Sequence, residues 1–144
     1  METARDILER KGRDVATIES SAWVLQAAKK MNERHIGALV VVDGEQVVGM
    51  FTERDILNRV VAEQRDAATT RVAEVMTTPV ACCRLSTPLS EIQGVMTEKR
   101  LRHLPIVEDG KLLGMISSGD VLASQVTIQQ TTIEYLNAYL YGRR

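Results

Sequence analysis

The sequence contains one unit twice. When the chain is shifted by 65 positions along itself, residues 15–57 align with residues 80–122 without a gap, and eleven aligned positions are identical. A repeat of this length indicates two copies of a supersecondary unit that cannot bury its apolar face alone. We therefore expect the copies to stack about a pseudo-twofold axis, with a cleft that presents the same chemical groups twice. The identical pairs include Ser21/Ser86, Gly49/Gly114, Asp55/Asp120 and Leu57/Leu122.

Each copy predicts the order strand, helix, strand, strand, helix. In the first copy, residues 38–42 and 47–51 are apolar runs on either side of a turn, which indicates a buried hairpin. We expect Ser20 or Ser21 to cap the helix before this hairpin and Thr52 to begin the helix after it. The prediction is an α/β (α+β) fold of two β-α-β-β-α repeats, built as two small sheets packed through their helices. The strands expected in both copies are 15–18, 38–42, 47–51, 80–83, 103–107 and 112–116.

One helix is expected on each side of the repeats. Thr3 and Asp6 can cap a short helix that Gly12 ends. Residues 118–141 predict a long helix, which either folds back on its own chain or pairs with a partner helix. The chain then divides into 1–71 and 72–144, which together form one module. The long helix carries a heptad seam, interrupted at Gln129, that consists of Leu122, Val126, Ile133, Leu136 and Leu140.

Composition narrows the class of function. With a net charge of −1 over 144 residues, the chain offers no electrostatic case for binding nucleic acid or an anionic membrane. No apolar stretch approaches the ~18 residues of a membrane span, and the N-terminus lacks a signal-peptide pattern. Cys82 and Cys83 are adjacent, so they cannot close a loop, and only one of them can face the core of a strand. We expect a cytoplasmic protein.

Each hairpin ends in a hydroxyl and an acid three residues apart, namely Thr52 with Asp55 and Ser117 with Asp120. This spacing is close to a capping box, a structural role that alone would explain the pattern. The same geometry also suits a nucleotide. The start of a helix presents free N–H groups to a phosphate, and a carboxylate there can accept both hydroxyls of a ribose. The residues alone leave both interpretations open.

The doubled motif resembles that of tandem cystathionine-β-synthase (CBS) domain pairs, also called Bateman modules. The resemblance covers roughly residues 12–125 and lies in the segments VVGMFTERD (47–55), VMTTPV (75–80), RHLPIV (102–107) and LLGMISSGD (112–120). It implies a regulatory module without catalysis of its own, which binds an adenine nucleotide between the repeats and signals to an effector protein. Such pairs typically form homodimers, so the resemblance also implies a second copy of this chain as a partner.

The resemblance further implies roles for single residues. Asp55 and Asp120 would hold ribose, whereas Thr52 and Ser117 would reach phosphate. The adenine would lie between apolar strand residues. Lys99, Arg100 and Arg102 are basic and would either neutralise phosphate or form a solvated face. The residues expected to contact nucleotide are Thr17, Ile36, Gly37, Ala38, Thr52, Arg54, Asp55, Val80, Ala81, Arg102, His103, Leu104, Pro105, Ser117, Gly119 and Asp120.

The two copies differ around the motif, which predicts two non-identical sites. AMP is the expected ligand, and ATP, NAD(P)(H) or S-adenosylmethionine are candidates for the second site. We expect neither a metal nor a catalytic cofactor, because His35 and His103 have no acid or cysteine at ligand spacing. Two alternatives remain at this level: a scaffold whose motifs only cap helices, and a weak nucleotide hydrolase.

Overall fold

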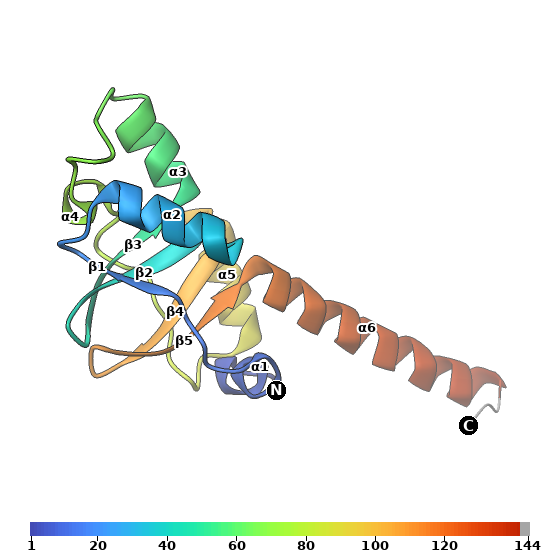
Figure 1. Cartoon of the computed structure of the whole chain (residues 1–144). Helices are drawn as coiled ribbons and strands as arrows, with labels where there is room; N and C mark the ends of the chain where they lie inside the picture. The colour runs from blue at the N-terminus through green and yellow to red at the C-terminus, as the bar shows by residue number, and fades with distance from the viewer. Residues whose placement is uncertain (142–144) are drawn as a thin grey trace.

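The computed structural model describes residues 1–141 and contains two similar halves, each with a hairpin flanked by helices (Figure 1). The mixed α and β architecture and the repeat are confirmed. In chain order the elements are α1 (Ala4–Lys11), β1 (Thr17–Glu19), α2 (Val24–Arg34), β2 (Ala38–Asp43), β3 (Gln46–Thr52), α3 (Glu53–Asp55), the π-helix η1 (Ile56–Val61), α4 (Val72–Val75), α5 (Leu89–Lys99), β4 (His103–Glu108), β5 (Lys111–Ser117) and α6 (Ser118–Tyr141).

The strands form one sheet in the order β1-β2-β3-β5-β4, so the prediction of two separate sheets is wrong. Gln46 of β3 pairs with Lys111 of β5 and joins the two antiparallel hairpins. Both hairpins turn at equivalent positions with positive φ, Gly44 (61°) and Asp109 (54°). Glycine and aspartate adopt this left-handed conformation more readily than most residues.

The strand predicted at residues 80–83 is also wrong, because this segment makes only the isolated parallel bridge Cys83–Ile106. The first repeat explains the difference. There the N–H of Val40 donates to the carbonyl of Ala16 over 3.2 Å. The residue equivalent to Val40 is Pro105, which has no N–H to donate. The second repeat therefore loses a bond that holds β1 against β2 in the first.

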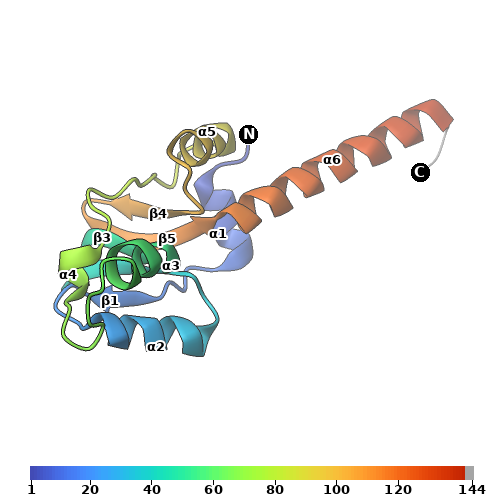
Figure 2. The same cartoon turned by 90° about the horizontal axis from the view of Figure 1, so that it is seen from above.

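The two hairpins pack face to face, with helices on the outside (Figure 2). Leu39 and Val41 face the cluster shared with α2, whereas Val40 and Val42 belong to a second cluster that includes Leu112 of β5. This alternation follows from the two-residue period of a strand. The expectation that the repeats pack through their helices is wrong, because residues of β2 and β5 meet between the repeats.

Each repeat is covered by the segment that precedes the other repeat. The helix α1 precedes the first repeat but packs on β5, where Leu8 lies against Gly114. The helix α4 precedes the second repeat and packs on β3, where Met76 lies against Gly49. An added Cβ would overlap Leu8 or Met76, so both identical glycines are required by a close approach.

The caps are as predicted for α1 but not for α2. The N–H of Thr3 donates to Asp6 over 2.9 Å, and Gly12, at φ 92°, ends the helix. The helix α2 begins after Trp23 instead of after Ser20 or Ser21, and the N–H of Trp23 donates to Gln26 over 2.8 Å. The indole is half-buried under the guanidinium of Arg71, 3.6 Å from the ring centroid.

The helix α6 extends away from the two hairpins (Figures 1 and 2). Its first turns pack against the described part of the chain, where Val121 and Ser124 are buried. The predicted seam is largely exposed, and Leu140 lies outside the side chains that the structure describes. Within residues 1–141 no helix is long and apolar enough to cross a membrane. The exposed seam residues are Leu122, Val126, Ile133 and Leu136.

Candidate functional site

A cavity of about 1040 Å³ lies between the start of β4 and the first corner, by which we mean the turn from β3 into α3 at Thr52–Asp55. The equivalent turn from β5 into α6 at Ser117–Asp120 is the second corner. Thr52 and Asp55 line the cavity from the first repeat, and Arg102 and His103 line it from the second. The cavity therefore combines groups from both repeats. Its lining consists of Gly37, Met50, Thr52, Glu53, Arg54, Asp55, Leu57, Thr77, Pro79, Val80, Ala81, Lys99, Arg100, Leu101, Arg102 and His103.

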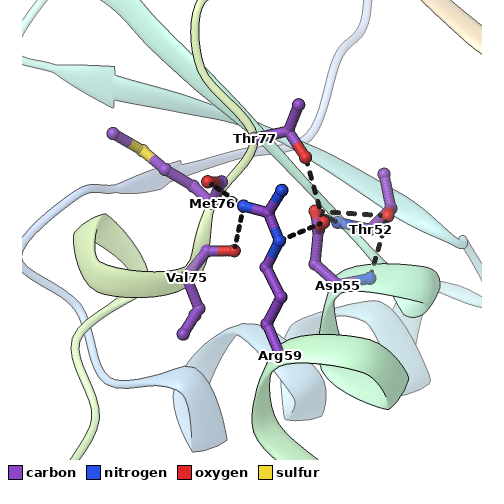
Figure 3. Close-up of polar contacts among 6 residues, drawn as sticks. All are labelled: Thr52, Asp55, Arg59, Val75, Met76 and Thr77. Carbon is purple, nitrogen blue, oxygen red and sulfur yellow. Dashed lines mark hydrogen bonds and ion pairs between the residues drawn. The ribbon is translucent and has the colours of Figure 1, made fainter.

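The carboxylate of Asp55 lies at the centre of a hydrogen-bond network (Figure 3). Its Oδ2 accepts from the N–H of Thr52 at 3.0 Å and from the Thr52 hydroxyl at 3.3 Å. Its Oδ1 accepts from the hydroxyl of Thr77 at 2.9 Å. The N–H of Asp55 donates back to Thr52 Oγ1 at 3.3 Å, which completes the predicted capping box. The side chain is only 8% exposed, and both of its oxygens have donors.

Arg59 ties this corner to the linker between the repeats. Its Nε lies 3.9 Å from Asp55 Oδ1, while its Nη1 donates to the carbonyls of Met76 at 2.8 Å and Val75 at 3.3 Å (Figure 3). Thr77 also pairs with β3, exchanging both main-chain hydrogen bonds with Met50. The linker is thus held to the corner by main-chain and side-chain bonds. Arg59 belongs to the π-helix η1, and π-helical turns are frequent at functional sites.

The wall from the second repeat is rich in cations. Lys99, Arg100 and Arg102 line it, and Arg54 faces the cavity from the first repeat. Burial lowers the pKa of His103 below the ordinary value of 6.5 for histidine, and the charges of Lys11 and Arg102 lower it further. The imidazole is therefore neutral near pH 7. This wall can neutralise a phosphate, because guanidinium and ammonium groups bind its oxygens directly.

The second corner has the same cap hydrogen bonds as the first, but its acid has a different side-chain partner. The N–H of Ser117 donates to Asp120 Oδ2 at 2.8 Å, and the N–H of Asp120 donates to Ser117 Oγ at 3.1 Å. Lys11 of α1 forms an ion pair with Asp120 at 2.6 Å. Burial raises the pKa of Asp120, but hydrogen bonds from Lys11 and Ser117 outweigh it, so the pKa is lowered. In the part of the chain that the structure describes, Asp120 does not line the cavity.

The structure brings half of the predicted residues together. Lining the cavity are Gly37, Thr52, Arg54, Asp55, Val80, Ala81, Arg102 and His103. Outside its lining lie Thr17, Ile36, Ala38, Leu104, Pro105, Ser117, Gly119 and Asp120. Ala38 and Leu104 are core residues of β2 and β4. The sequence did not indicate which corner faces which repeat, since that depends on how the hairpins stack.

Five further lining residues were not predicted: Met50, Glu53, Leu57, Thr77 and Pro79. Glu53 follows Thr52 directly, and its carboxylate lies against Gly37, where a Cβ would come within 3.1 Å of Glu53 Cδ. Thr77 carried one signal, a hydroxyl in the linker just before the second repeat. Only the tertiary structure shows that this hydroxyl reaches Asp55.

Other candidate chemistry is sparse. Among residues 1–141 there is no group of three or more His, Cys, Asp or Glu side chains placed to hold a metal ion. Cys82 is exposed and Cys83 is buried, so one of the two thiols faces the core as expected, although the segment is not a strand. Burial raises the pKa of Cys83 to about 12, so this thiol stays protonated and behaves as a small apolar residue.

Comparison with known proteins agrees with this fold. The CBS domain family model matches residues 4–62 and 72–126. The CBS domain-containing protein CBSX3 of Arabidopsis thaliana, described as mitochondrial, is 32% identical over 97% of this chain and 72% of its own. A putative signal-transduction protein with CBS domains from Burkholderia ambifaria is 42% identical, with a TM-score of 0.83 over 88% of this chain and 95% of its own.

The chain therefore belongs to the CBS domain family, as a pair of tandem repeats. Members of this family are mostly regulatory. The structure of CBSX2 in complex with AMP shares the fold, with a TM-score of 0.74 over 90% of this chain and 99% of its own, at 24% identity. At that identity the likeness concerns the fold alone.

Proposed function

We propose that this chain is a non-catalytic regulatory module that binds an adenine nucleotide, AMP first among the candidates, in the cavity between its repeats. The observation that carries the proposal is the cavity itself, whose lining combines the acid Asp55 of the first repeat with cations of the second. Its volume lies at the upper end of the ~300–1,000 Å³ usual for ligand pockets, so it can hold a mononucleotide. CBSX2, which has the same fold, has been observed with AMP.

The lining suggests how AMP would lie. The ribose hydroxyls would donate to Asp55, and the phosphate would face Lys99, Arg100 and Arg102. The adenine would lie on the apolar surface of Val80 and its neighbour Ala81. The acid belongs to the first repeat and these three cations to the second, so one nucleotide would touch both repeats. Binding would then favour whichever arrangement of the repeats holds the nucleotide more tightly.

Ribose binding requires one exchange in the network. Asp55 Oδ1 accepts from Thr77, whose hydroxyl can rotate to another partner. A ribose hydroxyl would take its place as a donor of the same kind, so the buried carboxylate would stay satisfied. This exchange would loosen the linker, and the ligand would thereby act on the contact between the repeats.

The satisfied state of Asp55 also supports the scaffold alternative, in which the motif only caps a helix. ATP, NAD(P)(H) and S-adenosylmethionine remain candidate ligands beside AMP, and nucleotide hydrolysis is the enzymatic alternative. The experiment is a thermal-shift series with each nucleotide, followed by a product assay. We expect AMP to raise the melting temperature of the wild type and Asp120→Asn, but not that of Asp55→Asn, because a ligand that binds only the folded state stabilises it. No shift with any nucleotide favours the scaffold, and product formation favours the enzyme.

We also propose that the module forms a homodimer in the cytoplasm and acts on an effector protein. Equivalent helices of the two repeats expose the same apolar side chains: Leu57 and Leu122 are each 61% exposed, Val61 62% and Val126 51%. Large apolar side chains repeated in this way are typical of an interface. A second copy presents the same paired surface, so a twofold arrangement would bury all four positions on both chains.

A further inference from the structure

The cavity lining contains two carboxylates, Glu53 and Asp55, which differ in how their charge is compensated. Asp55 accepts hydrogen bonds from Thr52 and Thr77, and its Oδ1 lies 3.9 Å from the Nε of Arg59. The side chain of Glu53 makes neither a hydrogen bond nor an ion pair with any residue that the structure describes. The charge of Glu53 is therefore left to act on a molecule that enters the cavity.

The main chain fixes Glu53 at the edge of the cavity. Its N–H donates to the carbonyl of Gly37 over 3.0 Å, and its carboxylate lies against Gly37. The second repeat has the same main-chain bond, from the N–H of Ser118 to the carbonyl of Arg102 over 2.8 Å. At these equivalent positions the first repeat has an acid beside a glycine, whereas the second has a neutral serine beside an arginine. Glu53 is thus an acid with no cation beside it.

The charge of Glu53 reaches the part of the cavity that the second repeat lines. Burial and the charges of Lys11 and Arg102 lower the pKa of His103, whereas the charges of Asp120 and Glu53 raise it. His103 lines the cavity together with Arg102, which is where we place the phosphate of the nucleotide. A phosphate in this region is attracted by the lining cations and repelled by Glu53.

The repulsion by a fixed charge grows in proportion to the charge of the ligand. Each phosphate that ADP or ATP carries beyond that of AMP adds negative charge, so Glu53 opposes ATP more strongly than AMP. The four lining cations, Arg54, Lys99, Arg100 and Arg102, attract the more highly charged nucleotide more strongly. Glu53 is the uncompensated group of the lining that offsets this preference.

We propose that Glu53 is the specificity-determining residue of the cavity, and that it favours nucleotides with one phosphate over those with two or three. This inference rests on the proposed function, because it concerns the ligand of the same cavity. It names AMP and other nucleoside monophosphates as the class of ligand. A merely structural role, in which an acid in the first turn of a helix stabilises that helix, would change stability but not the ratio of two affinities.

The test is to measure the dissociation constants of AMP and ATP by isothermal titration calorimetry, at low salt and with EDTA. Glu53→Gln keeps the shape of the side chain and removes its charge. Glu91→Gln removes the same charge from an exposed position of α5 outside the lining, and is the matched control. We expect the wild type to bind AMP more tightly than ATP. Glu53→Gln should shift the ratio of the two constants towards ATP by about 3- to 10-fold, and Glu91→Gln should keep the wild-type ratio. Added salt should reduce the shift.

An unchanged ratio in Glu53→Gln, or a wild type that prefers ATP, would overturn the inference and leave the proposed function intact, since a nucleotide still binds. If neither nucleotide binds the wild type, the proposed function fails and the inference fails with it. An NMR titration without ligand checks where the charge of Glu53 acts. The chain has two histidines, and the pKa of His103 should fall in Glu53→Gln because Glu53 raises it in the wild type. An unchanged pKa of His103 would also contradict the inference.

Discussion

Thr77 donates its hydroxyl hydrogen to Oδ1 of Asp55 over 2.9 Å, and this bond joins the linker between the repeats to the corner of the first repeat. The linker is already paired there, because Thr77 exchanges main-chain bonds with Met50. A change at Asp55 should therefore affect the position of the linker as well as that of the first corner. This makes Thr77 the first residue to test after the acid itself.

Replacing Thr77 with valine keeps the shape of the side chain and removes the donor. Loss of one partner of a buried carboxylate costs about 1–3 kcal/mol, so we expect the free energy of unfolding in denaturant to fall by roughly that amount. AMP should bind at least as tightly, since the ribose has no hydroxyl to displace. Thr78→Val, at the exposed neighbour, is the control. An unchanged stability, or loss of AMP binding, would contradict this role.

Gly49 and Gly114, which lie against Met76 and Leu8, should not tolerate a larger side chain. In Gly49→Ala the new methyl meets Met76, and in Gly114→Ala it meets the buried Leu8. Overpacking of this kind costs about 1–3 kcal/mol. Gly94→Ala is the matched control, because nothing lies within 4 Å of its added Cβ. Within α5 this change should stabilise by up to about 1 kcal/mol. Thermal unfolding that ranks all three variants alike would argue against the docking of α1 and α4.

His103 predicts a pH dependence of stability. Burial and the charges of Lys11 and Arg102 lower its pKa below 6.5 in the folded chain, although Asp120 and Glu53 oppose this. As the pH falls below 6.5, the unfolded chain takes up the proton first, so the free energy of unfolding falls until the pH passes the folded pKa. Unfolding of wild type and His103→Gln between about pH 8 and about pH 5 should show the wild type losing more stability. Parallel curves would rule out this effect.

The exposed apolar pair at the start of η1 and α6 predicts the oligomeric state. Leu57→Glu and Leu122→Glu place charges at equivalent positions of the proposed dimer face, and each should shift the chain towards monomer in analytical ultracentrifugation. Leu25→Glu, on the exposed face of α2 at 39% exposure, should leave the assembly unchanged. A wild type that is already monomeric, or a dimer that survives both substitutions, would show that another surface is used.

The repeat, the hairpins and the acidic corners were predictable because local rules determine them. Alternating and continuous apolar runs set the strands, and Thr52-x-x-Asp55 set the turn into the next helix. One incorrect prediction, the strand at residues 80–83, also has a local cause. Pro105 lies where Val40 donates a main-chain bond in the first repeat, so the weak strand at residues 80–83 could have been anticipated from the missing N–H.

The remaining failures are tertiary. Nothing local in the sequence indicates that α1 crosses to the second repeat, that Thr77 reaches Asp55, or that Lys11 reaches Asp120. These contacts depend on how the two hairpins stack, and the stacking depends on which faces of β2 and β5 are apolar together. The pattern of apolar residues along a strand shows which face is apolar, but it does not show which other strand packs against that face. Hence the acids were found, while the groups that contact them, Thr77 and Lys11, were not.

The most direct test of the central claim is a crystal structure of the chain with AMP at saturating concentration. We expect AMP in the cavity, its ribose hydroxyls within hydrogen-bond distance of Asp55, and its phosphate towards Arg102 of the other repeat. The Thr77 hydroxyl should then have turned away from Asp55. A cavity that stays empty, or AMP bound without contact to Asp55, would contradict this claim.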